Sequence, residues 1–63
     1  MSDNPIIIKP GVLIAIGKIT YIVVNIVGRD AVLADRYNMH GDKKRFSLDY
    51  LRTQIMEGVY ELK

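Results

Sequence analysis

The stretch that decides the fold is "PGVLIAIGKITYIVVNIVGRDAVLADR", residues 10–36. The turn signals "GK" at 17–18 and "GRD" at 28–30 divide it into short apolar segments rich in β-branched residues. Such segments, bounded by glycine, are typical of strands. The glycines follow one another too closely for ordinary helices to fit between the turns. We therefore predict three consecutive strands, at 12–16, 19–27 and 31–36.

The segment 19–27 is apolar at both its even and its odd positions, apart from Thr20 and Asn25. A strand in a sheet with one solvated face alternates between apolar and polar residues, so this strand is predicted to be central. Its second face would be covered by a helix, by the curl of a barrel or by another copy of the chain. The segment 31–36 ends in charge and is predicted to be an edge strand.

The apolar period changes at Ser47, which is a good helix N-cap because its hydroxyl accepts a hydrogen bond from a free amide. Leu48, Leu51 and Ile55 recur at the spacing of one helix face. Gly58 is a natural residue for the helix end. The following "VYEL", residues 59–62, alternates and predicts a short closing strand.

These elements predict one domain over residues 1–63 that is mainly β. The first choice is a small SH3-like barrel of about five strands with one short C-terminal helix, because closure of a barrel removes exposed strand edges. The alternative is an α+β fold, in which a three-stranded antiparallel sheet packs on one helix. Residues 1–9, which include "PIIIK", are expected to form either a flexible arm or a first strand.

The composition excludes several classes of protein. The chain has 63 residues, no cysteine, one histidine and a net charge of +2. Without cysteine there is no disulfide framework, and one histidine argues against a structural zinc site. No apolar run approaches the roughly 18 residues of a membrane span, and "MSDN" lacks the positive start of a signal peptide. We expect a cytoplasmic protein with no metal, no cofactor and no membrane association.

Catalysis is not predicted. His40 is the sole imidazole and lies in "NMHGD", a loop composition with no assembled base and orienting group. The lysine and threonine of "GKIT" lack the glycine spacing of a phosphate-binding loop. We therefore expect no enzyme and name no catalytic residue.

Cations and one aromatic residue gather in the connections around the segment 19–27. They are Lys18, Arg29, Arg36, Tyr37, Lys43, Lys44 and Arg45. Nucleic-acid binders use cations to replace counterions on phosphates and aromatic rings to stack on bases. The alternative is a solvated rim, since Asp30, Asp35 and Asp42 are interspersed among the cations.

A second set predicts a protein interface: Ile6, Ile7, Ile8 and Tyr50. Three exposed isoleucines would promote aggregation, so an apolar arm needs a surface to cover it. Tyr50 lies off the apolar face of the predicted helix and is expected at the core margin or against a partner. A homodimer or another protein interaction is the alternative to nucleic-acid binding.

The stretch 10–36, followed by "RFSLDYLRTQIMEGV", resembles small β-barrel modules in Mu-like DNA transposases and related phage and mobile-element proteins. The positions that carry the resemblance are Pro10, Gly11, Gly17, Lys18, Tyr21, Val32, Leu33, Ser47, Leu48 and Gly58. The resemblance implies an SH3-like barrel, a bacterial or phage setting and association with DNA or a DNA-handling complex. No catalytic acidic triad carries over, so it implies an accessory module or a free-standing regulator.

The leading hypothesis is therefore a non-enzymatic protein that binds nucleic acid, with DNA as the expected form. The alternative is a homodimerisation or protein-interaction module that modulates a host or phage complex. Sequence specificity, strand order and oligomeric state stay open at this level.

Overall fold

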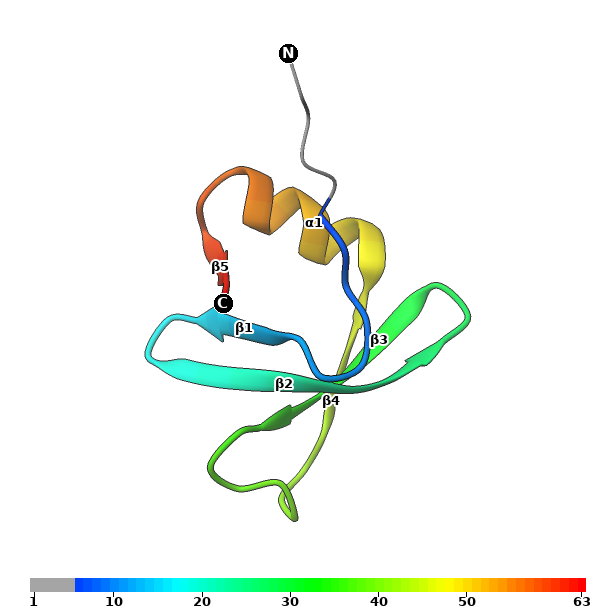
Figure 1. Cartoon of the computed structure of the whole chain (residues 1–63), viewed down its shortest axis with the longest axis vertical. Coiled ribbons are helices and arrows are strands. Elements are labelled where there is room, and N and C mark those ends of the chain that lie inside the picture. Colours follow the sequence, from blue (N-terminus) through cyan, green and yellow to red (C-terminus); the bar gives the residue numbers. More distant parts are fainter. Residues whose placement is uncertain (1–5) are drawn as a thin grey trace.

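The computed structural model describes residues 6–63 and shows one antiparallel sheet with a short helix (Figure 1). The elements are β1 (Leu13–Ile16), β2 (Ile19–Val27), β3 (Asp30–Asp35), β4 (Lys44–Ser47), α1 (Leu48–Met56) and β5 (Tyr60–Leu62). The sheet has five strands in the order β4-β3-β2-β1-β5. The fold is therefore mainly β, as predicted, and the alternative of a three-stranded sheet is wrong.

Two tight hairpins build the centre of the sheet. Ile16 pairs with Ile19 and Val27 pairs with Asp30, which leaves two-residue loops that each begin with a glycine. Gly17 and Gly28 have positive φ angles of 64° and 60°. Glycine at the first loop position is typical of the type II′ turn, whose twist matches that of the flanking strands. The predicted turn signals thus join β1, β2 and β3 into a meander.

The position of β3 differs from the prediction. The segment was expected at an edge, but β3 lies between β2 and β4, with Val32 opposite Arg45 and Leu33 opposite Lys44. The edge strand is β4, whose sequence "KRFS" falls within the stretch that we expected to be a connection. The charges that suggested an edge lie where β3 ends, at the partly buried Asp35 and the exposed Arg36 that follows the strand.

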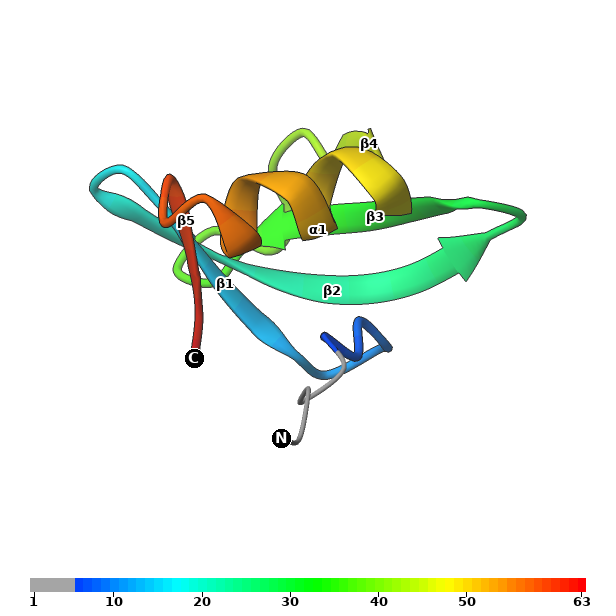
Figure 2. The same ribbon diagram turned by 90° about the horizontal axis from the view of Figure 1, so that it is seen from above.

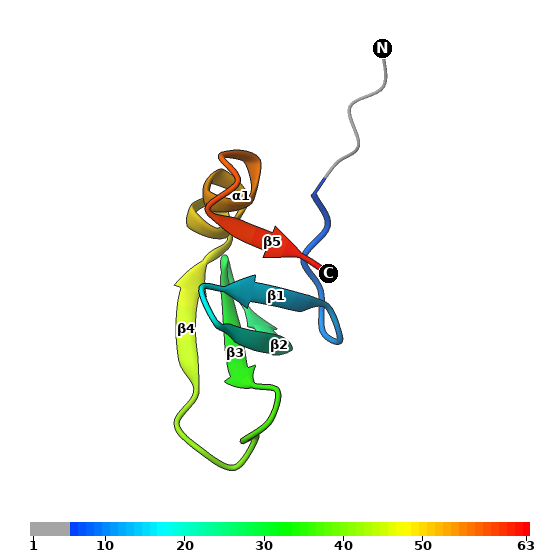
Figure 3. The same ribbon diagram turned by 90° about the vertical axis from the view of Figure 1, so that its left-hand side faces the viewer.

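The sheet is open, so the closed SH3-like barrel is wrong. The strand order leaves β4 and β5 at opposite edges, and no pairing joins them within residues 6–63. Both strands are short, with four and three residues, and α1 contacts both of them. Figures 2 and 3 show β4 leading into the helix and β5 returning from it to pair with β1. The helix thus connects the two edge strands, which would pair with each other directly in a closed barrel.

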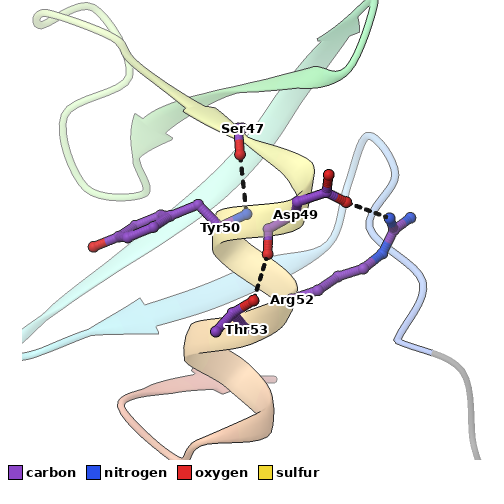
Figure 4. A network of polar contacts seen from close by, with 5 residues as sticks. All are labelled: Ser47, Asp49, Tyr50, Arg52 and Thr53. Carbon is purple, nitrogen blue, oxygen red and sulfur yellow. Dashed lines mark hydrogen bonds and ion pairs between the residues drawn. The ribbon is translucent and has the colours of Figure 1, made fainter.

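The helix begins and ends as predicted. Ser47 Oγ accepts a hydrogen bond of 2.9 Å from the Tyr50 amide (Figure 4). Leu51 is fully buried, and Leu48 and Ile55 pack beside it against the core. Gly58 follows the helix with a φ of 79°.

A β-bulge changes which positions of β2 face the core. The register with β3 shifts between Val23 and Asn25. Before the shift Val23 lies opposite the buried Leu33, and after it Ile26 lies opposite the buried Ala31. The core-facing side of β2 therefore passes from odd to even positions, as an inserted residue requires. The prediction of a central strand is confirmed.

The predicted arm at 1–9 is described only in part, because residues 1–5 lie outside the described chain. Residues 6–9 form no regular element. Ile8 nevertheless joins the core at 8% exposure, whereas Ile7 is 58% exposed and Ile6 is half-buried. The Gly11 amide donates to the Val23 carbonyl at 2.8 Å, which fixes the chain where the arm meets the sheet.

Candidate nucleic-acid interface

The connection between β3 and β4, residues 36–43, gathers part of the predicted basic set. Arg36 leaves β3 and donates its amide to the Thr20 carbonyl at 3.0 Å, so it lies beside the start of β2. The connection returns at Lys43 and Lys44, since Lys44 lies opposite Leu33 of β3. The turn that holds Lys18 immediately precedes β2 at this same end of the sheet.

We call this region the loop-end surface. It consists of Lys18, Arg36, Tyr37, Lys43 and Lys44, all exposed. Its main connection is the loop that projects at the lower end of the molecule in Figure 3.

Backbone and side-chain hydrogen bonds order this connection. Asp35 Oδ1 accepts from the Tyr37 amide at 2.9 Å, and the Asp35 carbonyl accepts from the Asn38 amide at 3.0 Å. A second turn follows, in which the Gly41 amide donates to the Asn38 carbonyl at 3.1 Å. Aspartate commonly begins a turn in this way, by accepting from the amide two residues on. The backbone that carries Arg36 and Tyr37 is therefore held in one conformation.

Tyr37 is the most exposed large apolar side chain of the described residues, at 83%. The Arg36 guanidinium carbon lies 5.7 Å from the centre of its ring. This distance is within the range of a cation–π contact. The pair presents a flat ring and a fixed positive charge at the same point of the surface.

The loop-end surface carries a surplus of positive charge. Within residues 6–63, none of Lys18, Arg36, Lys43 and Lys44 takes part in an ion pair. Two carboxylates, Asp35 and Asp42, lie in the same region. Asp35 already accepts a hydrogen bond from the backbone of its own turn. Lys43 Nζ also donates to the Met39 carbonyl at 3.4 Å. The four cations of this surface outnumber its two carboxylates, and the solvated rim stays the alternative prediction.

The structure does not bring Arg29 and Arg45 to this surface. Arg29 lies in the β2–β3 turn, at the far end of β3 from Arg36, and an extended chain of that length spans about 23 Å. Arg45 Nε lies 2.9 Å from Asp30 Oδ2, so its charge is partly neutralised and directed toward the Arg29 end. The predicted set is thus divided between the two ends of the sheet.

The residues predicted for a protein interface are also divided. Ile8 is part of the core and Ile6 is half-buried, which leaves Ile7 as the exposed isoleucine of the described arm. Tyr50 is 45% exposed and belongs to an aromatic row that links the two edge strands. We call this row, made of Phe46, Tyr50 and Tyr60, the aromatic seam.

Contacts within the aromatic seam are close. The Tyr50 ring stacks on Phe46 with a centroid distance of 6.0 Å and an interplanar angle of 11°. It meets Tyr60 edge-on at 6.0 Å, and the two hydroxyl oxygens are 3.3 Å apart. This hydroxyl contact, with burial, raises the pKa of Tyr60 above its usual value. Phe46 is therefore engaged within the molecule.

His40 is exposed in the connection, and no side-chain hydrogen bond to it occurs among the described residues. Between residues 6 and 63, no group of three or more histidine, aspartate or glutamate side chains is arranged to hold a metal ion. In that same part of the chain, no helix has the length and apolar character needed to cross a membrane.

Sequence reasoning missed β4 and, with it, the seam. The available signal was the alternation in "KRFS", where Lys44 and Phe46 share one face and Arg45 and Ser47 share the other. Nothing in the sequence places the Tyr60 hydroxyl beside that of Tyr50.

Searches against protein-family models, curated proteins and solved structures find no match to this chain. The resemblance to Mu-like transposase modules therefore stays a prediction.

Proposed function

We propose that this protein is a non-enzymatic module that binds nucleic acid, with DNA as the expected form, through the loop-end surface. The observation that carries the proposal is the strand register, which places four unpaired cations and one exposed tyrosine at one end of the sheet. Lys18, Arg36, Lys43 and Lys44 would replace counterions along a phosphate backbone, which is the main source of affinity in such complexes.

The biological setting belongs to the same proposal. A cytoplasmic accessory or regulatory protein of a phage or mobile element accords with the resemblance in sequence and with the absence of cysteine. Arg29 and Arg45 are not needed for this binding mode. They lie toward the other end of the sheet, and Arg45 is paired with Asp30.

The test is a salt-dependent titration of a fluorescently labelled oligonucleotide by anisotropy. The variant is Lys43→Gln with Lys44→Gln. The matched control is Arg29→Gln with Arg52→Gln, which removes the same charge from residues outside the loop-end surface. Each lost phosphate contact lowers the slope of log affinity against log salt by roughly 0.7–0.9. For the loop-end variant, we expect the slope of log affinity against log salt to be smaller in magnitude than that of the wild type by about 1.5. For the control, we expect the wild-type slope.

Two outcomes would contradict the proposal. One is no binding by the wild-type protein at low salt to duplex DNA, single-stranded DNA or RNA. The other is equal weakening by the two double variants, because net charge alone would then account for the binding.

A protein interface is the second candidate, and specific exposed residues favour it. Met56, the last residue of α1, is 77% exposed, and Val59, in the segment that joins α1 to β5, is 58% exposed. The unpaired edge of β5 follows directly, and exposed edges of this kind favour pairing with another chain. Sedimentation at micromolar concentration tests the homodimer form, and a strict monomer would count against it.

A further inference from the structure

We propose that the loop-end surface takes single-stranded nucleic acid, with one unpaired base stacked on the Tyr37 ring. The inference deepens the proposed function and rests on it. It names the form of nucleic acid that the surface recognises.

Tyr37 is the aromatic ring that the fold does not use. Tyr21 is buried in the core at 8% exposure, and the other three rings form the aromatic seam. Tyr37 contributes little to stability at 83% exposure, since burial of apolar surface is what stabilises a fold. Its neighbour Arg36 is its one aromatic or cation–π contact among the described residues.

The backbone that carries the ring is also ordered. The hydrogen bond from the Tyr37 amide to Asp35 fixes the backbone below it, and the guanidinium of Arg36 lies 5.7 Å from the ring centre. With a side chain this exposed, a ring face stays open to a ligand. An aromatic group that is ordered before binding loses little conformational entropy when a base stacks on it.

The chemistry selects an unpaired base. In a duplex the faces of the bases are covered by their neighbours in the stack, and proteins read the edges in the grooves. A single strand offers free faces, and base–aromatic stacking tolerates any base because each has a π-face. Lys43 and Lys44 at the end of the same connection would hold the flanking phosphates.

The experiment compares Tyr37→Leu with Tyr37→Phe on four labelled ligands of equal length. They are oligo-dT, oligo-U, a single strand made entirely of abasic sites, and a DNA duplex. The abasic strand keeps the phosphates and lacks the bases, so it isolates the contribution of stacking. Because Tyr37 is outside the core, both variants should fold, which circular dichroism would verify.

We expect Tyr37→Leu to weaken binding of oligo-dT or oligo-U by roughly 5- to 100-fold, the range for loss of one stacked base. Binding of the abasic strand and of the duplex should change by less than about twofold. Tyr37→Phe should retain the affinity for the single strands, since the ring is kept. The dT and U arms decide whether the base comes from DNA, from RNA or from either.

The failures are distinguishable. If Lys43→Gln with Lys44→Gln leaves binding of all four ligands unchanged, the proposed function fails and the inference fails with it. If that variant weakens all four, but Tyr37→Leu affects the abasic strand and oligo-dT equally, the stacking inference alone is overturned. An unchanged affinity of Tyr37→Leu for both single strands overturns it in the same way.

Discussion

The sheet is held together differently at its centre and between its edges. At the centre, β1, β2 and β3 are joined by backbone pairing and lie against four fully buried aliphatic side chains, Ile14, Val23, Leu33 and Leu51. Between the edges, β4 and β5 share no backbone pairing in the described chain, and half-exposed rings of the aromatic seam connect them through α1. The stability of the centre comes from burial of aliphatic side chains, whereas the seam is held by contacts between aromatic rings.

The difference shows how so short a chain covers its core without closing a barrel. A closed barrel requires two edge strands long enough to pair along their length, whereas β4 and β5 have four and three residues. The helix and the seam cover the same apolar surface with side chains instead. We therefore expect large effects from substitutions at the centre and small effects from those at the seam.

The largest effect is expected for Leu33→Ala in the core. Leu33 is fully buried, and such a substitution costs about 2–5 kcal/mol through lost transfer energy and the cavity left behind. A domain of this size has roughly 3–9 kcal/mol of total stability, so much of it would be lost. Urea unfolding followed by circular dichroism measures the change. The matched control is Leu62→Ala on the β5 edge, at 36% exposure, with an expected loss of about 1 kcal/mol.

The next effect concerns the hairpin that joins β2 to β3. Gly28→Ala places a side chain at a φ of 60° with no atom within 4 Å of the new Cβ, so the cost comes from backbone strain alone. We expect about 1–2 kcal/mol. The control is Gly41→Ala, whose Cβ would lie 2.7 Å from the Asn38 side-chain amide. The nearest atom is at the far end of the Asn38 side chain, which can rotate, and the Asn38 carbonyl oxygen would lie 3.3 Å from the new Cβ. We expect the smaller loss for Gly41→Ala because its φ is not positive, and a larger loss than for Gly28→Ala would contradict this account.

The seam is tested by a double-mutant cycle. Phe46→Leu and Tyr50→Leu each remove one ring of the stacked pair, and the cycle isolates the energy between them. We expect a coupling of about 0.5–1.5 kcal/mol in urea unfolding, the usual range for aromatic pairs. A coupling near zero would show that α1 alone joins the edge strands and that the rings contribute only their area.

The smallest effect is a dependence on high pH. The pKa of Tyr60 is raised in the folded protein, chiefly by the hydrogen bond with the Tyr50 hydroxyl. The folded state therefore holds the Tyr60 proton more tightly than the unfolded state does. This stabilisation is complete below pH 10.0, the ordinary pKa of tyrosine, and is lost as the pH rises through the higher folded value.

The Tyr60→Phe variant isolates this contribution. At neutral pH it should cost less than about 1 kcal/mol, because the hydroxyl contact is partly solvated. Between pH 9 and pH 11 its stability should fall less steeply than that of the wild type. An identical fall in both proteins would exclude Tyr60 as the titrating group.

Much of the fold could be predicted from local signals. Gly17 and Gly28 mark turns because two-residue hairpins need a positive φ at that position. Ser47 and the spacing of Leu48, Leu51 and Ile55 predict the helix for equally local reasons. The bulge in β2 has no such local signal. The sequence shows only that both the odd and the even positions of the strand are largely apolar, and we interpreted that pattern as burial on two faces.

The predictions that were wrong concern features that depend on pairing between residues far apart in the sequence. The strand β4 is short, charged and free of glycine at its ends, so its sequence indicates it only weakly and its pairing with β3 establishes it. The same register decides the candidate site, since it separates Lys44 from Arg45 by placing them on opposite faces. No local pattern predicts that Arg45 pairs with Asp30, fifteen residues earlier in the chain.

The placement of two cations on the outermost strand has a consequence for how copies of the molecule meet. Lys44 and Arg45 occupy the first half of β4, beside its unpaired backbone groups. A second molecule that docked its own β4 there in parallel, in-register fashion would place Lys44 beside Lys44 and Arg45 beside Arg45, and the electrostatic repulsion would oppose growth of a continuous intermolecular sheet. Lys44, which belongs to the proposed nucleic-acid surface, would thus also oppose fibril formation along this edge of the sheet.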